Sequence, residues 1–204
     1  MEMKTTSGSE KKLRTNYAMI LIPICIAINV VGGLIANNLK LPIFLDAIGT
    51  CLSAIILGPL LGAATGFMTQ LVVALINGEV LVIAFGLVQV GVGLTAGLFA
   101  KYGMFQKWWH VLVASLVAAF AAALIAAPVA TFLFGGVHGQ GVDFLVAGLM
   151  ATGRDVFSSA FLARIPANLI DKGMALVISF IIMKRLPDNM KNLIPAPKKA
   201  AQKE

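Results

Sequence analysis

Long apolar runs follow one another along almost the whole chain and restrict its possible folds more than any other sequence feature. The run over residues 17–36 has about 20 residues, the length that an α-helix needs to cross a bilayer. Hydrophobic residues make up 59% of the 204 residues and charged residues only 12%, against about 25% charged residues in soluble domains. A water-soluble fold could not bury this much apolar surface. The sequence therefore predicts an all-α integral membrane protein.

Short polar breaks divide this apolar part into six predicted spans that form one bundle. The second and third spans come from a single long run that Gly58-Pro59 interrupts near its middle. The predicted spans cover residues 17–36, 44–57, 60–76, 80–100, 110–134 and 164–183. Two short separate helices are expected over residues 143–152 and 156–163, with Pro166 in the first turn of the sixth span. The chain would comprise a polar N-terminus (1–16), a membrane domain (17–186) and a basic tail (187–204).

Basic residues are concentrated on one side of this predicted topology. With six spans, both termini and the loop over residues 101–107 share a side. That side carries Lys11, Lys12, Arg14, Lys101, Lys107, Lys184 and Arg185, whereas Lys40, Arg154 and Arg164 lie on the other. The positive-inside rule then predicts that both termini are cytoplasmic. Topology accounts for the net charge of +7, so no nucleic-acid partner is expected.

The sixth span carries a polar face that lipid should not tolerate. Its members recur at helical spacing and are Arg164, Asn168, Asp171, Lys172, Ala175 and Ser179. The opposite face carries Leu169, Ile170, Met174 and Val177. Ionisable groups inside a membrane usually face the bundle interior or a water-filled cavity. The pattern favours a polar substrate pocket built from Arg164, Asn168, Asp171 and Lys172; a salt bridge that only joins helices is the alternative.

Most other polar groups fall in the outer half of the predicted bundle. The protein should therefore form a cavity that is open to the outside and closed on the cytoplasmic side. Weaker candidates for substrate contacts are Asn37, Gln89 and His138. Phe157 or Phe161 could supply aromatic stacking. Asp46 is expected to pair with Lys172 or Arg164, or to cap its helix.

The sequence lacks the motifs of P-loop nucleotide-binding sites, zinc metalloproteases and serine hydrolases. The chain has no G-x-x-x-x-G-K-[ST], H-E-x-x-H or G-x-S-x-G pattern. His110 and His138 fall on opposite sides of the predicted topology and cannot share a metal. Cys25 and Cys51 both lie within apolar segments and are interpreted as small core residues. We therefore expect no cofactor, no metal and no enzymatic activity.

Four stretches together resemble a known family. Residues 41–50 (LPIFLDAIGT) and 57–62 (LGPLLG) resemble the second-helix signature of S components of energy-coupling factor (ECF) vitamin transporters, nearest to the riboflavin-type branch. Residues 28–33 (INVVGG) and 166–172 (PANLIDK) are similar to the same branch. The resemblance extends over about residues 17–187.

This resemblance implies a six-helix, multi-pass subunit of the bacterial cell membrane. Such subunits bind a vitamin or precursor from outside, dock on a membrane scaffold subunit (the T component) driven by two ATPase subunits, and topple to release the substrate. Docking in the family uses small residues on the first helices, often A-x-x-x-A; this chain has Gly32-xxx-Ala36 and Asn29-xxx-Gly33. Pyridoxine-like or hydroxymethylpyrimidine-like compounds, riboflavin and cobalamin remain open as substrates.

The expected function is high-affinity capture of such a molecule, with ATP hydrolysis supplied by partner subunits. The main alternative is a stand-alone small secondary transporter or channel. That alternative requires polar residues in the inner halves of the helices or inverted repeats. An intramembrane enzyme and a purely structural subunit are the remaining alternatives.

Overall fold

The described residues of this computed structural model, 3–187 together with 191 and 194, are helical apart from turns and loops. The elements in chain order are α1 (Met3–Asn38), α2 (Ile48–Leu57), α3 (Pro59–Asn77), the 3-10 helix η1 (Val80–Phe85), α4 (Gly86–Lys101), α5 (Trp108–Phe134), α6 (Asp143–Ala151) and α7 (Val156–Arg185). Helix α1 begins well before the apolar run. Most of the predicted basic tail lies outside the described residues.

Five helical segments among the described residues are long and apolar enough to cross a membrane. They are Thr15–Asn38, Pro59–Asn77, Val80–Lys101, Trp108–Phe134 and Val156–Arg185. Helix α2 has only 10 residues, which corresponds to about 15 Å and roughly half of a bilayer core. Five of the six predicted spans are thus found as membrane-length helices, and the second is not confirmed as a full span.

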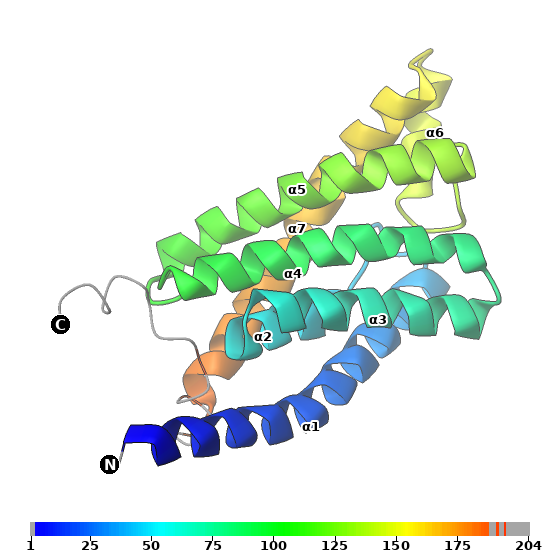
Figure 1. Cartoon of the computed structure of the whole chain (residues 1–204). Coiled ribbons are helices and arrows are strands. Elements are labelled where there is room, and N and C mark those ends of the chain that lie inside the picture. The colour runs from blue at the N-terminus through cyan, green and yellow to red at the C-terminus, as the bar shows by residue number, and fades with distance from the viewer. Residues whose placement is uncertain (1–2, 188–190, 192–193, 195–204) are drawn as a thin grey trace.

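The helices run back and forth between two ends of the bundle (Figure 1). Helices α3, α4 and α5 lie alongside one another, and α7 crosses them and packs closely against α5. The first turns of α1 and the last turns of α7 lie at one end. At the opposite end, here called the loop end, lie the turn at Asn77–Glu79 and the loop over residues 135–142. Helix direction alternates as the sequence predicted.

Local signals explain where several helices begin and end. Pro59 begins α3, where its missing N–H has no intrahelical partner to lose. Gly78 and Gly135 follow α3 and α5 in the left-handed conformation that glycine favours at helix ends. Asp155 precedes α7, and its side chain accepts a hydrogen bond from the Ser158 N–H at 2.9 Å.

Helix α7 is continuous from Val156 to Arg185, so the prediction of a separate short helix over residues 156–163 was wrong. Pro166 lies in the helix interior rather than in the first turn. Proline removes one backbone hydrogen bond, but membrane helices tolerate it where neighbouring groups satisfy the freed carbonyl. Asp171 consequently lies about 22 Å along the helix from Val156. The ionisable residues therefore occupy the middle of α7 and not its outer end.

Residues 44–47 were predicted to be helical, but α2 begins only at Ile48. Leu45 has a φ of 54°, which is incompatible with a right-handed helix. Irregular backbone at membrane depth is tolerated where protein buries it or where it lines a cavity. Both conditions apply to the segment over residues 41–47, here called the crossing segment, because it passes between α1 and α7.

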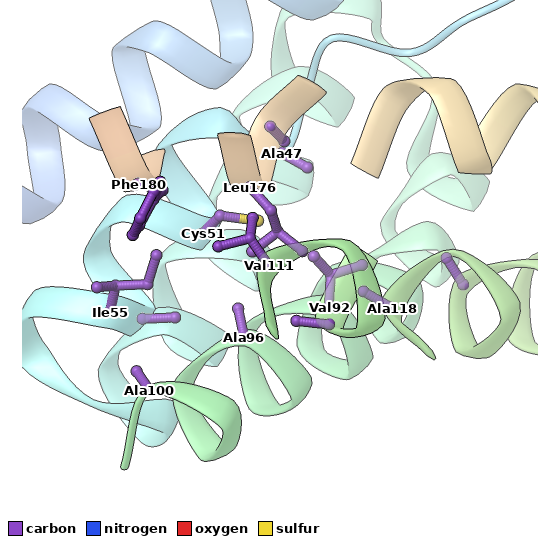
Figure 2. Packing of buried hydrophobic residues seen from close by; sticks show 14 of the residues in the cluster. Ala47, Cys51, Ile55, Val92, Ala96, Ala100, Val111, Ala118, Leu176 and Phe180 are labelled. Carbon is purple, nitrogen blue, oxygen red and sulfur yellow. The ribbon is translucent and has the colours of Figure 1, made fainter. Parts of the chain in front are cut away.

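The core at the end away from the loops consists of small and branched apolar side chains (Figure 2). Phe180 and Leu176 of α7 pack with Val111 of α5, and Cys51 and Ile55 of α2 lie beside them. Alanines at every fourth position of α5 (Ala114, Ala118, Ala122) are fully buried and allow close helix contact. Cys25 and Cys51 are buried and unbridged, which confirms that both are core residues.

Close backbone approach at Gly49 fixes α2 against α1. A side chain at this position would overlap the carbonyl group of Cys25, which is backbone and cannot turn away. Gly173 in α7 has no atom within 4 Å of the corresponding position. The two glycines therefore form a matched pair for testing the packing.

We expect Gly49→Ala to lower the free energy of unfolding by about 1–3 kcal/mol, because the added methyl group overpacks the contact. Gly173→Ala should leave stability unchanged or raise it by about 0.5–1 kcal/mol. Thermal unfolding of the purified variants in detergent measures both effects. Equal unfolding temperatures for Gly49→Ala and the parent protein would contradict the packing described.

Candidate substrate-binding site

A cavity of about 410 Å³ lies at the loop end of the bundle. It is enclosed by the end of α1, the crossing segment, the end of α3, the start of η1 and the loop over residues 135–142. Its polar lining residues are Asn37, Lys40, Asp46, Gln70, Asn77, Glu79, His138 and Gln140. This volume falls within the range of pockets that bind small molecules.

A narrow extension of about 40 Å³ continues from this cavity into the bundle. Phe44, Asp46, Gln70 and Gln140 line both spaces. The extension reaches four further polar residues, Gln89, Arg164, Asn168 and Lys172. Its volume is enough for about one water molecule. The structure thus brings six of the seven candidates from the sequence to these two connected spaces, with Asn37 and His138 in the wider one.

Lys172 lies between two carboxylates at the inner end of the cavity. Its Nζ is 2.6 Å from Asp171 Oδ2 and 3.5 Å from Asp46 Oδ1. The Lys172 side chain is 2% exposed and that of Asp46 is 19% exposed. The predicted pairing of Asp46 with Lys172 is confirmed, whereas Asp46 does not cap α2, because Ala47 holds that position.

Asp171 lines neither space, and its carboxylate is occupied by the protein itself. Oδ1 accepts hydrogen bonds from the backbone N–H groups of Phe44 at 3.2 Å and Leu45 at 2.6 Å. These bonds hold the crossing segment, including the unfavourable backbone conformation of Leu45. The geometry therefore gives Asp171 a positioning role.

Arg164 and Asp143 join α7 to the loop over residues 135–142. Arg164 Nη2 lies 3.9 Å from Asp143 Oδ1 and 3.5 Å from His138 Nδ1. Asp143 Oδ2 accepts from the backbone N–H groups of His138 at 2.8 Å and Gln140 at 2.9 Å. Sequence reasoning did not select Asp143 as a functional residue. Its position in the first turn of a short helix after a glycine-rich loop was the available signal.

His138 presents an unpartnered ring nitrogen at the cavity. Its side chain is 4% exposed and stacks on Phe85, with ring centroids 4.8 Å apart. Burial lowers the pKa of His138 below its ordinary value, against the opposing effect of Asp143, so the ring is neutral at neutral pH. Its Nδ1 lies between Arg164 Nη2, which can only donate, at 3.5 Å and Asp143 Oδ1, which can only accept, at 3.6 Å. Nε2 is buried without a hydrogen-bond partner among the described residues.

Buried amide and hydroxyl groups fix the floor of the cavity. Gln89 Nε2 donates to the Asp46 carbonyl at 3.1 Å, and Gln89 Oε1 accepts from Thr50 Oγ1 at 3.1 Å. Asn29 donates to Thr50 and Thr69 and accepts from the Gly49 N–H at 2.7 Å. The network connects α1, α2, α3 and α4 beneath Asp46. Sequence reasoning missed the roles of Asn29, Thr50 and Thr69, because their partners are distant in sequence.

Asn168 and Gln70 complete the polar lining. Asn168 Nδ2 donates to the Arg164 carbonyl one helical turn earlier, at 2.9 Å. Gln70, which the sequence analysis did not name, donates from Nε2 to Asp46 Oδ2 at 3.1 Å. Two side chains therefore donate to Asp46 from opposite sides, Lys172 and Gln70.

The aromatic residues at the site differ from those predicted. Phe157 and Phe161 stack on each other, with centroids 6.4 Å apart, and Phe161 contacts Phe120 of α5. Neither ring lines the two spaces: Phe157 is 44% exposed, and Phe161 lies edge-on to Phe120 of α5. Phe44 lines both spaces instead, and Phe85 lines the inner one. The prediction of stacking by Phe157 or Phe161 was therefore wrong.

The family of the chain follows from comparison with known proteins. A family model described as "ECF transporter, substrate-specific component" matches residues 17–183. The chain belongs to this family. No curated protein and no solved structure matches the chain. Substrate-specific components are binding subunits of transporters, so the protein is a membrane transport subunit. The riboflavin-type branch stays a prediction.

Within the described residues, no group of three His, Cys, Asp or Glu side chains could hold a metal.

We expect Asp171→Ala to destabilise the protein strongly, by about 3–5 kcal/mol, because it removes one partner of a buried ion pair. The crossing segment should then become susceptible to limited proteolysis. Asp155→Ala is the control: it removes an exposed helix cap, should lower the unfolding temperature much less than Asp171→Ala, and should not expose that segment to proteolysis. Equal unfolding temperatures and equal proteolysis of the two variants would contradict the positioning role of Asp171.

Proposed function

We propose that this protein captures a vitamin or vitamin precursor with high affinity at the loop-end cavity, as the S component of an ECF-type importer. The observation that carries the proposal is the cavity of about 410 Å³ with buried polar groups at its inner end. A small number of placed polar groups beside apolar and aromatic walls is typical of small-molecule sites. Membership of the substrate-specific component family supports the same function.

The polar lining stops in the middle of the bundle, which favours binding over conduction. Below Asp46 and Lys172 the core consists of apolar residues such as Cys51, Ile55 and Val92. The nearby Ser179 hydroxyl is hydrogen-bonded to the Ala175 and Ile48 carbonyls. A channel would require polar lining through both halves of the membrane. Release of the substrate inside therefore calls for a large movement driven by partner subunits.

The distribution of basic residues supports an outward-facing cavity. Lys101, Lys107, Lys184 and Arg185 lie at the end opposite the loop end. By the positive-inside rule, that end faces the cytoplasm and the cavity opens to the outside of a bacterial cell membrane. This orientation suits capture of a scarce nutrient before transport.

The small-residue pairs of α1 are used inside the subunit. A side chain at Gly32 would overlap the Leu45 carbonyl, Ala36 is 3% exposed, and Asn29 belongs to the buried network. They do not form an external docking face for the T component. We propose that docking uses the exposed apolar side of α1, formed by Ile20, Ile24, Ile28, Val31 and Ile35.

Neighbouring asparagines at the end of α1 allow a matched test of the site. Asn37 lines the cavity, and no described residue hydrogen-bonds to its buried Oδ1, whereas Asn38 is exposed and donates to the Leu34 carbonyl. The ligand is first identified by mass spectrometry of small molecules that copurify with the protein. Asn37→Ala should then weaken binding about threefold to tenfold, as expected for one lost hydrogen bond. Asn38→Ala should bind like the parent protein in calorimetric titration, and the same affinity for all three proteins would place the site elsewhere.

Uptake should require the partner subunits. In proteoliposomes, we expect this chain alone to bind the copurified molecule without accumulating it, even with an ion gradient. Accumulation should appear when a T component, two ATPase subunits and ATP are present. Accumulation by the chain alone would replace the proposal with a stand-alone transporter.

A further inference from the structure

The charged groups around the cavity leave an excess of negative charge. The cations that line the two spaces are Lys40, Arg164 and Lys172. The carboxylates that line these spaces or pair with these cations are Asp46, Glu79, Asp143 and Asp171. His138 is neutral. Among the described residues this group therefore contains three cations and four carboxylates, of which Asp46 and Glu79 line the spaces and Asp143 and Asp171 pair with the cations.

The cations are already engaged by the protein. Lys172 lies between Asp171 and Asp46, and Arg164 lies beside Asp143. Lys40 Nζ donates to the Gly139 carbonyl at 2.6 Å, which joins the crossing segment to the loop over residues 135–142. An anionic ligand would have to displace these contacts and approach Asp46 and Glu79. The cavity therefore disfavours carboxylates and phosphates.

Two unpartnered polar atoms at the cavity indicate what a ligand must offer. Asn37 Oδ1 is buried without a donor among the described residues, and it can only accept a hydrogen bond. His138 Nε2 is likewise without a hydrogen-bond partner among the described residues, on a side chain that is 4% exposed. Buried polar atoms without partners are costly, so a ligand that pairs with both recovers that cost. Asp46, partly exposed in the same cavity, is a further acceptor.

We infer that the substrate is a compact heteroaromatic compound with an N–H edge, formed by an amino group or a protonated ring nitrogen. This edge faces Asp46 and Asn37, and another polar atom of the compound pairs with His138 Nε2. This inference rests on the proposed function and narrows its substrate class. We infer an aromatic ring in the substrate because Phe44 lies in the cavity wall and because His138 and Phe85 stack on each other beside it. The N–H groups of this edge donate hydrogen bonds. When the amino group or ring nitrogen is protonated, it also carries a positive charge, which offsets the excess negative charge around the cavity. The neutral His138 ring adds no cation that would compete with a positively charged substrate.

The test compares ligands that share a ring and differ at one group. One pair is pyridoxamine and 4-pyridoxic acid, which carry an aminomethyl group and a carboxylate at the same position. The second pair is 4-amino-5-hydroxymethyl-2-methylpyrimidine and its 4-hydroxy counterpart. Affinities are measured by calorimetric titration of the purified full-length protein in detergent, and molecules extracted from the protein are identified by mass spectrometry.

We expect the amino member to bind at least tenfold tighter in at least one pair, and the extracted molecule to carry an N–H donor. Asp46→Asn should reduce this preference at least tenfold, and Asn37→Asp should increase it. Asp155→Asn, at the exposed start of α7, should leave the preference unchanged. Because Asp46→Asn could impair folding, its unfolding temperature is measured in parallel and Asn37→Asp provides the independent variant.

Failure of this inference differs from failure of the proposed function. An extracted molecule without an N–H donor, or tighter binding of the acid and hydroxy members, would overturn the substrate class and leave vitamin capture intact. A protein that carries no extractable molecule and binds none of the four compounds would overturn both.

Discussion

The buried contact between Lys172 and its two carboxylates is the interaction on which the site depends. An unpaired charge at this depth would destabilise the fold, and the Lys172 ammonium group is instead paired with Asp171 at 2.6 Å and with Asp46 at 3.5 Å. The same Asp171 carboxylate accepts two backbone N–H groups from the crossing segment. One group of charges therefore joins the middle of α7 to the backbone that precedes α2. Without it, the non-helical crossing segment would lose two backbone hydrogen bonds and its charged connection to α7.

The polar network extends this arrangement sideways beneath the cavity. Gln89 and Gln70 hold the backbone and side chain of Asp46, and Asn29 holds the start of α2 through Gly49. Buried polar groups that are fully hydrogen-bonded fix one arrangement of a core, because every alternative leaves a donor or acceptor unpaired. Asp46 is thus held rigidly while its carboxylate stays partly exposed to the cavity. A rigid acceptor of this kind is suited to selecting a substrate by its donors.

The two halves of the bundle perform different tasks. At the loop end, two irregular segments and the ends of α1, α3 and η1 leave a cavity with polar walls. At the other end, alanine and glycine contacts bring the helices close together. Among the described residues, the core of this half is apolar, and its buried Ser53 and Ser115 hydroxyl groups are hydrogen-bonded within their own helices, which agrees with a subunit that binds a substrate and does not conduct it. Membership of the substrate-specific component family agrees with one half that binds the substrate and another half that is closed.

The sequence by itself determined the membrane class, most helix boundaries to within a few residues, and the polar face of α7. Those features follow from local rules: apolar length, helical periodicity and breaks at Gly58-Pro59 and Gly78. Periodicity also identified Arg164, Asn168, Asp171 and Lys172, all of which are buried while Leu169 and Ile170 are exposed.

Other features required the three-dimensional structure. Residues 44–47 are irregular, α7 continues through Pro166, and Phe157 and Phe161 lie away from the cavity. The tertiary structure also distinguishes Asp171, which positions the crossing segment, from Asp46, whose carboxylate is partly exposed to the cavity. These features depend on contacts between residues that are far apart in the sequence, such as Leu45 and Asp171 with a separation of 126 positions, and local sequence patterns do not identify such partners.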